Sequence, residues 1–329
     1  MSWEDRRKLL GQIEEIRKSR VLLYVTGDRQ HQETNIGSDV FDHFVEHLDA
    51  VGVTPRISLV IHTRGGDGMA AWSLVNLVRM FCDDLEIIIP EKAHSAGTMI
   101  AMAADRIVMT KQATISPIDP SLSHPLGPSV AGAPPNSRAQ VSVEAVQGYI
   151  DLAKELVGSG NKEAMGPIML DLARQVHPLV LGESYRRRQQ TRTLAEKLLG
   201  PHVKKSENRK KIIDFLSSDS GSHDYTLNRR EAETLGLPIE KCPAKLYPIV
   251  STLYKDFRDE MKLREPFNIQ QFPSDTRMRF KNLRAVIEST AGPCTHFITE
   301  GVVVREPKPA PAAGQATRLE DVSDGWRTI

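Results

Sequence analysis

The sequence has little of what marks membrane proteins and nucleic-acid-binding proteins. Its 329 residues include 43 basic and 42 acidic side chains, so no overall charge attracts it to nucleic acid or to an anionic membrane surface. No stretch approaches the ~18 consecutive apolar residues of a membrane-spanning helix. The first ten residues, MSWEDRRKLL, contain no apolar signal-peptide core. We therefore expect no membrane span, and nucleic acid is disfavoured as a partner.

Cysteine and cofactor signatures are equally scarce. Cys82, Cys242 and Cys294 are odd in number and widely spaced, so they form neither a disulfide framework nor a metal-binding pattern. The glycine turn at 65–68 lacks the spacing of a dinucleotide fingerprint, and no phosphate-binding loop of the G-x-x-x-x-G-K-[ST] type occurs. We predict no cofactor, no metal site and a location in the reducing cytoplasm.

The chain is organised around residues 61–109, which contain two successive strand-to-helix units. Continuous apolar runs bounded by turn residues are typical of buried parallel strands, and apolar residues at helical spacing follow them. The strands are predicted at Ser58–His62, Glu86–Pro90 and Arg106–Met109, and the helices at Met69–Phe81 and Met99–Ala104. This alternation predicts an α/β fold.

Two of the turns in this stretch carry residues suited to acyl-transfer chemistry. Gly65 and Gly66 allow the backbone to approach a ligand closely and to direct amides at it. Ser95 stands where a strand gives way to a helix, and Ala96 and Gly97 leave space around its hydroxyl. A serine in this position is either a nucleophile beside an oxyanion hole or an ordinary helix cap.

Four segments resemble one known family. They are HTRGGD (His62–Asp67), KAHSAGTMIAMAADRIVM (Lys92–Met109), SPIDPS (Ser116–Ser121) and SHDYTLNRREAETLGL (Ser222–Leu237). These segments resemble the serine dehydrogenase proteinase (SDH) family of Clp/crotonase-fold serine peptidases, which is related to signal peptide peptidase A and to the Clp proteolytic subunit. The resemblance implies a core of repeated β-β-α units, a homo-oligomer and a serine-type peptidase.

The resemblance also implies roles for individual residues. Ser95 corresponds to the nucleophile. Gly65 and Gly66 help to form the oxyanion hole, together with the amide of Ala96. Asp224 corresponds to the acid of a catalytic triad.

The sequence does not identify which residue is the general base. His124 lies in the region that supplies the base in Clp-type enzymes, but the matching position falls at Ile118–Asp119. His223 precedes Asp224, and neighbouring residues on a strand face opposite sides, so only one of the two points easily at the serine. Lys154 would serve in a serine–lysine dyad of the signal peptide peptidase A type. Asp119 either orients a base or closes a turn.

The predicted organisation has five parts. They are an N-terminal amphipathic helix (1–20), a Clp/crotonase-like core (21–139 and 218–240), a helical insertion (140–217), a C-terminal extension (241–304) and a disordered or loosely attached tail (305–329).

The leading hypothesis is a soluble, ATP-independent serine peptidase that cleaves a peptide or protein substrate. The substrate would bind as an extended strand beside the glycine turn. A crotonase-like acyl-CoA enzyme, using the same oxyanion hole without a nucleophile, is one alternative. A catalytically silent or latent oligomeric assembly module, with Ser95 as a helix cap, is another.

Overall fold

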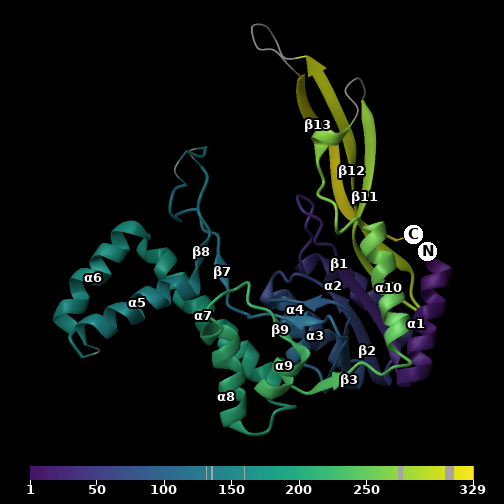
Figure 1. The fold of residues 1–329 in the computed structure, drawn as a ribbon, viewed down its shortest axis with the longest axis horizontal. Helices are drawn as coiled ribbons and strands as arrows, with labels where there is room; N and C mark the ends of the chain where they lie inside the picture. The colour runs from purple at the N-terminus through teal and green to yellow at the C-terminus, as the bar shows by residue number, and fades with distance from the viewer. Residues whose placement is uncertain (131, 135, 159, 273–276, 308–314, 329) are drawn as a thin grey trace. The chain divides into compact units, whose positions relative to one another are not determined.

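The computed structural model describes residues 1–130, 132–134, 136–158, 160–272, 277–307 and 315–328. It divides the chain into two compact units. The first unit comprises Met1–Ile115 and Thr226–Ile329, and the second comprises Ser116–Tyr225. Each unit is described separately below (Figure 1).

The first unit is built on an eight-stranded sheet with the order β10-β5-β3-β2-β1-β11-β12-β13. The strands from β10 to β1 pair in parallel, and those from β1 to β13 pair antiparallel. Their bounds are β1 (Arg20–Thr26), β2 (Thr54–His62), β3 (Cys82–Ile89), β5 (Arg106–Met109), β10 (Ile239–Lys241), β11 (Met278–Ser289), β12 (Cys294–Pro307) and β13 (Gln315–Thr328). The predicted α/β class is confirmed.

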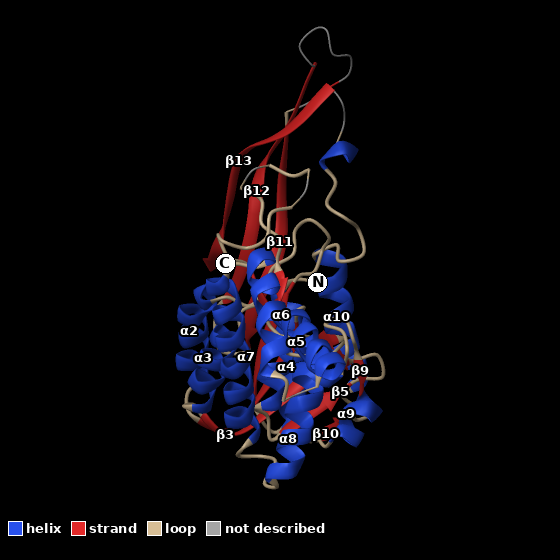
Figure 2. Cartoon of the chain, turned by 90° about the vertical axis from the view of Figure 1, so that its left-hand side faces the viewer, coloured by secondary structure: helices blue, strands red, loops and turns tan. Residues whose placement is uncertain are grey.

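Helices cover both faces of this sheet, which explains why the residues of its central strands are mostly apolar and buried. On one face, α1 (Trp3–Arg17) and α10 (Tyr247–Glu260) pack on alternate residues of β1, including Leu23. On the other face, Tyr24 meets Phe44 of α2 (Phe41–Val51) with ring centroids 5.2 Å apart. Helix α3 (Gly68–Arg79) packs beside α2. Figure 2 shows α2 and α3 on one side of the sheet and α10 on the other.

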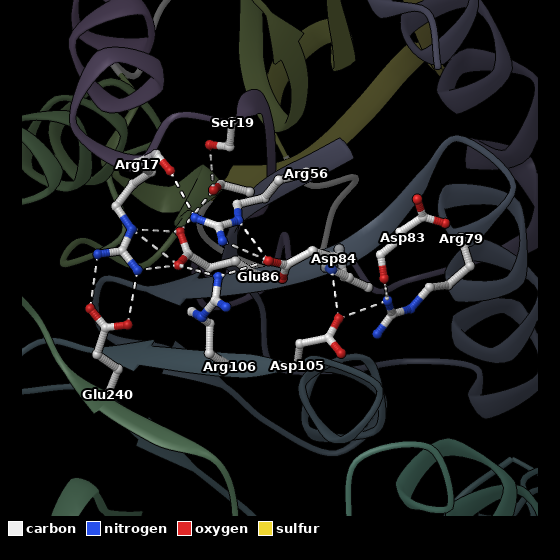
Figure 3. A network of polar contacts seen from close by, with 12 residues as sticks. Arg17, Ser19, Arg56, Arg79, Asp83, Asp84, Glu86, Asp105, Arg106 and Glu240 are labelled. Carbon is white, nitrogen blue, oxygen red and sulfur yellow. Dashed lines mark hydrogen bonds and ion pairs between the residues drawn. The ribbon is translucent and has the colours of Figure 1, made fainter. Parts of the chain in front are cut away.

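A buried ion-pair network ties α1 to the parallel strands (Figure 3). The Arg17 guanidinium binds Glu86 of β3, with Nε 2.9 Å from Oε1, and Glu240 of β10 at 2.8 Å. The hydroxyl of Ser58 donates to Glu86 at 2.8 Å. Because Glu86 is fully buried, these partners offset the cost of removing its charge from water.

A second, three-stranded sheet lies next to the sequence-predicted turns. It consists of β4 (Lys92–Ala93), β6 (Thr114–Ile115) and β9 (Leu227–Asn228), followed by α9 (Arg229–Leu235). Ala93 pairs with Ile115 in parallel, and Ile115 pairs with Leu227 antiparallel. Because β4 and β6 run parallel and β9 runs antiparallel to them, the chain leaves Ala93, leaves Ile115 and arrives at Leu227 at the same end of these strands.

The second unit is mainly helical. Its helices are α5 (Val143–Val157), α6 (Lys162–Gln175), α7 (Pro178–Leu199), α8 (Ser206–Asp214) and a π-helical turn (Phe215–Asp219), and its hairpin is β7 (Ser121–Leu122) with β8 (Val141–Ser142). The unit extends on both sides of the insertion predicted at 140–217. In neither unit do the described residues form a helix with the length and apolar character needed to cross a membrane.

The C-terminal residues differ from the expected loosely attached tail. The C-terminal extension predicted at 241–304 includes β11 and most of β12, and a third strand, β13, pairs with β12 from Gln315 to Thr328. The composition of this segment is polar, which led to the expectation of disorder. The ladder with β12 supplies backbone hydrogen bonds that composition does not reveal.

Candidate active site

Ser95 adopts an uncommon backbone conformation at the start of α4 (Ala96–Met102), with φ 50° and ψ −114°. A positive φ at a residue with a Cβ costs about 1–3 kcal/mol and persists only where the surroundings impose it. The Ser95 side chain is half-buried and makes no capping hydrogen bond to α4. The helix-cap interpretation of this serine therefore lacks its defining contact.

The small residues around Ser95 are required by close packing. A Cβ added to Gly97 would lie 2.5 Å from Cγ2 of Thr63, so no larger residue fits between α4 and the end of β2. The Thr98 hydroxyl donates to the carbonyl of Ala93 at 2.8 Å, which fixes the entry into the helix. The packing of Gly97 and the hydrogen bond of Thr98 thus fix the start of α4, where Ser95 lies.

Gly65 lies directly against Ser95. Its φ is 116°, and a Cβ added there would come within 2.7 Å of the Ser95 Cβ and 3.2 Å of the Ala96 nitrogen. Only glycine allows this approach. The structure therefore brings together Gly65, Ser95 and Ala96, as the sequence predicted.

The amide of Gly66 faces away from the segment that pairs with this turn. The Ile36 amide donates to the Gly65 carbonyl at 2.8 Å, and the Asp67 amide donates to the Ile36 carbonyl at 2.8 Å. In a parallel bridge of this kind the groups of the intervening residue point to the opposite side. Within the described part of the chain, the amides of Gly66 and Ala96 donate no hydrogen bond. Two amides beside Ser95 are thus available to an oxyanion.

Asp67 has a structural role at the start of α3. Its carboxylate accepts a hydrogen bond from the Ala70 amide at 2.8 Å and caps α3. The cap fixes the position where the glycine turn becomes a helix.

Two histidines adjacent to these turns are occupied elsewhere. Nε2 of His94 lies 2.9 Å from the Thr114 hydroxyl, and burial, followed by the charge of Lys92, lowers the pKa of His94 to about 4. His62 is buried against Tyr254 of α10, with ring centroids 5.3 Å apart.

In the second unit, His223 and Asp119 form a hydrogen-bonded pair. Nδ1 of His223 lies 2.8 Å from Oδ1 of Asp119, whose side chain is largely buried. This hydrogen bond raises the pKa of His223 above its ordinary value, against the opposing effect of partial burial. Asp224, the acid implied by resemblance, is exposed, and its amide bonds to the Ser222 hydroxyl at 3.2 Å. The acid that holds His223 is therefore Asp119.

The other candidate bases have local partners. Nδ1 of His124 accepts a hydrogen bond from the Leu126 amide at 3.0 Å, and its Nε2 lies 3.8 Å from Glu183. Lys154 pairs with Asp151 at 2.9 Å on the exposed face of α5. The structure brings neither of them to His223 or Asp119.

A polar cavity of about 570 Å³ adjoins the Asp119–His223 pair. Glu144 and Arg188 line it and bind each other at 2.9 Å. Burial raises the pKa of Glu144, although Arg188 opposes the shift. The His223 imidazole and the carboxylates of Asp119 and Glu144 thus border the same cavity.

A strained serine at the start of a helix, packed against a glycine turn, is an arrangement typical of serine hydrolases. Residues 2–154 match the family model described as ClpP-like SDH-type serine proteinase, and this segment contains both Ser95 and the glycine turn. The family resemblance is confirmed over these residues, and so is the predicted enzyme class, a serine-type peptidase.

Two uncharacterized proteins of Methanocaldococcus jannaschii are similar over most of the chain. One is 27% identical over 259 residues (76% of this chain and 78% of its own), and the other 25% over 254 residues (74% and 75%).

Solved structures with similar folds include two proteases. The 1510-N membrane-bound stomatin-specific protease is 15% identical with a TM-score of 0.39, covering 69% of this chain and 82% of its own. ClpP1 from Listeria monocytogenes is 13% identical with a TM-score of 0.37, covering 71% and 99%.

Sequence reasoning missed the partnership of Asp119 with His223. The two residues are 104 positions apart, and no local spacing connects them. The one available signal was that the Clp-type base position aligns with Ile118–Asp119, which placed a polar residue of the site at this point of the chain.

Proposed function

We propose that this protein is an ATP-independent serine peptidase in which Ser95 attacks the peptide carbonyl. The observation that carries the proposal is the contact of Gly65 with Ser95 and with the Ala96 amide, which brings the glycine turn next to the serine. Each amide that donates to the oxyanion contributes up to ~3–4 kcal/mol to lowering the barrier.

We assign the general base to His223, oriented by Asp119. Their hydrogen bond supports the assignment because it fixes the imidazole tautomer and stabilises the imidazolium that forms during attack. Chain connectivity supports it too. Asp119 follows Ile115 by four residues and His223 precedes Leu227 by four, and both of these strand residues align with Ala93, two residues before the serine.

The reaction then proceeds in two balanced steps. His223 accepts the Ser95 proton as the oxygen bonds to the carbonyl carbon, and it returns that proton to the departing amine, which leaves an acyl-enzyme. A water molecule gives its proton to His223 and attacks the ester. The proton then returns to Ser95 as the acid product leaves.

The substrate in this proposal is an extended peptide or protein segment. Ile36 occupies one edge of the glycine turn, so a substrate strand would pair on the opposite edge, the side of the Gly66 amide. A homo-oligomer and a cytoplasmic location also remain proposals. The three buried free cysteines agree with a reducing compartment.

The direct test is cleavage of fluorescently labelled casein without added nucleotide. We expect wild type to release soluble fluorescence and Ser95→Ala to lose at least ~10³-fold of that activity, since the nucleophile is gone. Ser38→Ala, which removes an exposed serine of the same unit, serves as the matched control.

Equal cleavage by wild type and Ser95→Ala would contradict the proposal. No cleavage by any variant, even with nucleotide present, would favour the assembly-module alternative.

A further inference from the structure

Outside the candidate active site, three potential metal ligands meet beside the turn of the β11–β12 hairpin. Glu288 of β11 pairs directly with Cys294 of β12, and His296 follows two residues later on the same strand face. One ligand atom of each residue lies within 4.8 Å of the other two. Among the described residues this is the only group of at least three such side chains.

The separations match the coordination sphere of a small ion. Sγ of Cys294 lies 3.0 Å from Nε2 of His296 and 3.3 Å from Oε1 of Glu288, and Nε2 lies 3.8 Å from Oε1. Tetrahedral zinc, with bonds of about 2.0–2.3 Å, separates its ligand atoms by roughly 3.3–3.6 Å. Shifts of a few tenths of an ångström would convert one arrangement into the other.

We propose that Glu288, Cys294 and His296 bind a zinc ion, with water as the fourth ligand. Thiolate, imidazole and carboxylate together favour zinc over the hard cations magnesium and calcium. Glu288 and Cys294 are almost completely buried, and the His296 side chain is 12% exposed, so the ligands are held in place before an ion arrives.

The charges around the cluster leave room for a cation. The Arg6 guanidinium binds Glu288 at 2.8 Å, which would oppose a metal if Arg6 had no other partner. It also binds Asp256 at 3.1 Å and Glu260 at 2.8 Å, and the Met1 amino group binds Asp256. Two positive groups therefore face three carboxylates. Adding Zn²⁺ while the thiol loses its proton to solvent brings this group of charges to neutrality.

The ion would act as a structural staple. It would join β11 to β12 beside the turn between them, where β11 also pairs with β1, and Arg6 would link it to α1. Ligands that bind only the folded state stabilise that state, so zinc should raise the melting temperature. This site is not predictable from the sequence, because Cys294 and His296 match no common zinc spacing and Glu288 joins them only through strand register.

The test titrates the purified, chelator-treated full chain with Co²⁺, a spectroscopic substitute for Zn²⁺. We expect one equivalent to bind with intense tetrahedral absorption and a thiolate-to-cobalt charge-transfer band, and one equivalent of Zn²⁺ to abolish both. No saturable binding on the folded wild-type protein, or binding without the charge-transfer band, would overturn the proposal.

Variants then locate the site. Cys294→Ser should lose the charge-transfer band and the zinc-dependent rise in melting temperature, whereas Cys82→Ser and Cys242→Ser, which change the other two buried thiols, should keep both. If Cys294→Ser does not fold, His296→Gln provides the second test, with at least ~10-fold weaker binding expected from the loss of one ligand. A band that persists in both variants would also overturn the assignment.

Discussion

At the scale of single residues, the candidate site depends on backbone conformations that its neighbours enforce. Ser95 has a positive φ although it carries a Cβ, and Gly65 has a φ that a side chain rarely adopts. The two conformations are linked because Gly65 leaves room for Ser95 and for the Ala96 amide. Strain of this kind, retained beside unpaired amides, is typical of a catalytic turn.

Replacing Gly65 should lower the peptidase activity by more than the accompanying loss of stability would explain. In Gly65→Ala the new Cβ would lie 2.7 Å from the Ser95 Cβ, so the turn must move. Its amides would then no longer point at the position of the oxyanion. We expect casein cleavage to fall by at least ~10²-fold, the effect of losing an oxyanion donor. Gly52→Ala is the matched control, because Gly52 also has a positive φ but open space around it. Comparable activity losses in the two variants would contradict this account of the turn.

The pH dependence should report the Asp119–His223 pair. His223 must be neutral to accept a proton, so the rate should fall as the pH drops through its pKa, which Asp119 raises. In Asp119→Asn the pKa should decrease and the acid limb of the rate profile should move to lower pH, with a lower plateau. The profile is measured as casein cleavage between pH 5 and 9, and His124→Gln should leave the midpoint unchanged. An unshifted midpoint in Asp119→Asn would exclude His223 as the base.

At the scale of elements, the parallel strands and α1 depend on buried charges as well as on apolar packing. Glu86 is inaccessible to solvent in the middle of β3, and Arg17 is its principal partner (Figure 3). Such pairs contribute little net stability compared with apolar residues, but losing one partner leaves an uncompensated buried charge.

Arg17→Met should therefore lower the free energy of unfolding by about 3–5 kcal/mol, measured by urea denaturation. Lys8→Met removes an exposed ion pair with Asp5 on the same helix and should have almost no effect. The double variant Arg17→Met/Glu86→Gln should regain part of the loss, because the buried charge is gone. Equal stability of Arg17→Met and Lys8→Met would contradict the role given to this network.

The elements were more predictable than the contacts between them. β5 (Arg106–Met109) matches its predicted bounds, because an apolar run bounded by turn residues is a local signal. Ser95 and its glycine turn were also predicted from local features. The positive φ of Ser95 and the pairing of Asp119 with His223 were not, since both arise from contacts between distant segments.

At the scale of the whole molecule, the second unit is an insertion between two strands of the first. Ile115 of β6 and Leu227 of β9 are paired neighbours in an antiparallel ladder, so a two-residue turn can join them. The first unit retains its complete sheet and helices α1 to α4 without the insertion.

A shortened chain with residues 116–226 replaced by Asn-Gly should consequently fold, with a single cooperative thermal transition by circular dichroism. It should also lose casein cleavage, because Asp119 and His223 are removed. Failure of the shortened chain to fold would contradict the independence of the first unit. Retention of wild-type cleavage would contradict the assignment of the base.

The most direct test of the central claim, that Ser95 is an activated nucleophile, is labelling with a fluorophosphonate followed by intact-mass measurement. The account predicts one adduct on wild type and on Ser38→Ala, none on Ser95→Ala, and labelling slowed by at least ~10²-fold in His223→Ala. An adduct that persists in Ser95→Ala, or folded wild-type protein that acquires none, would contradict it.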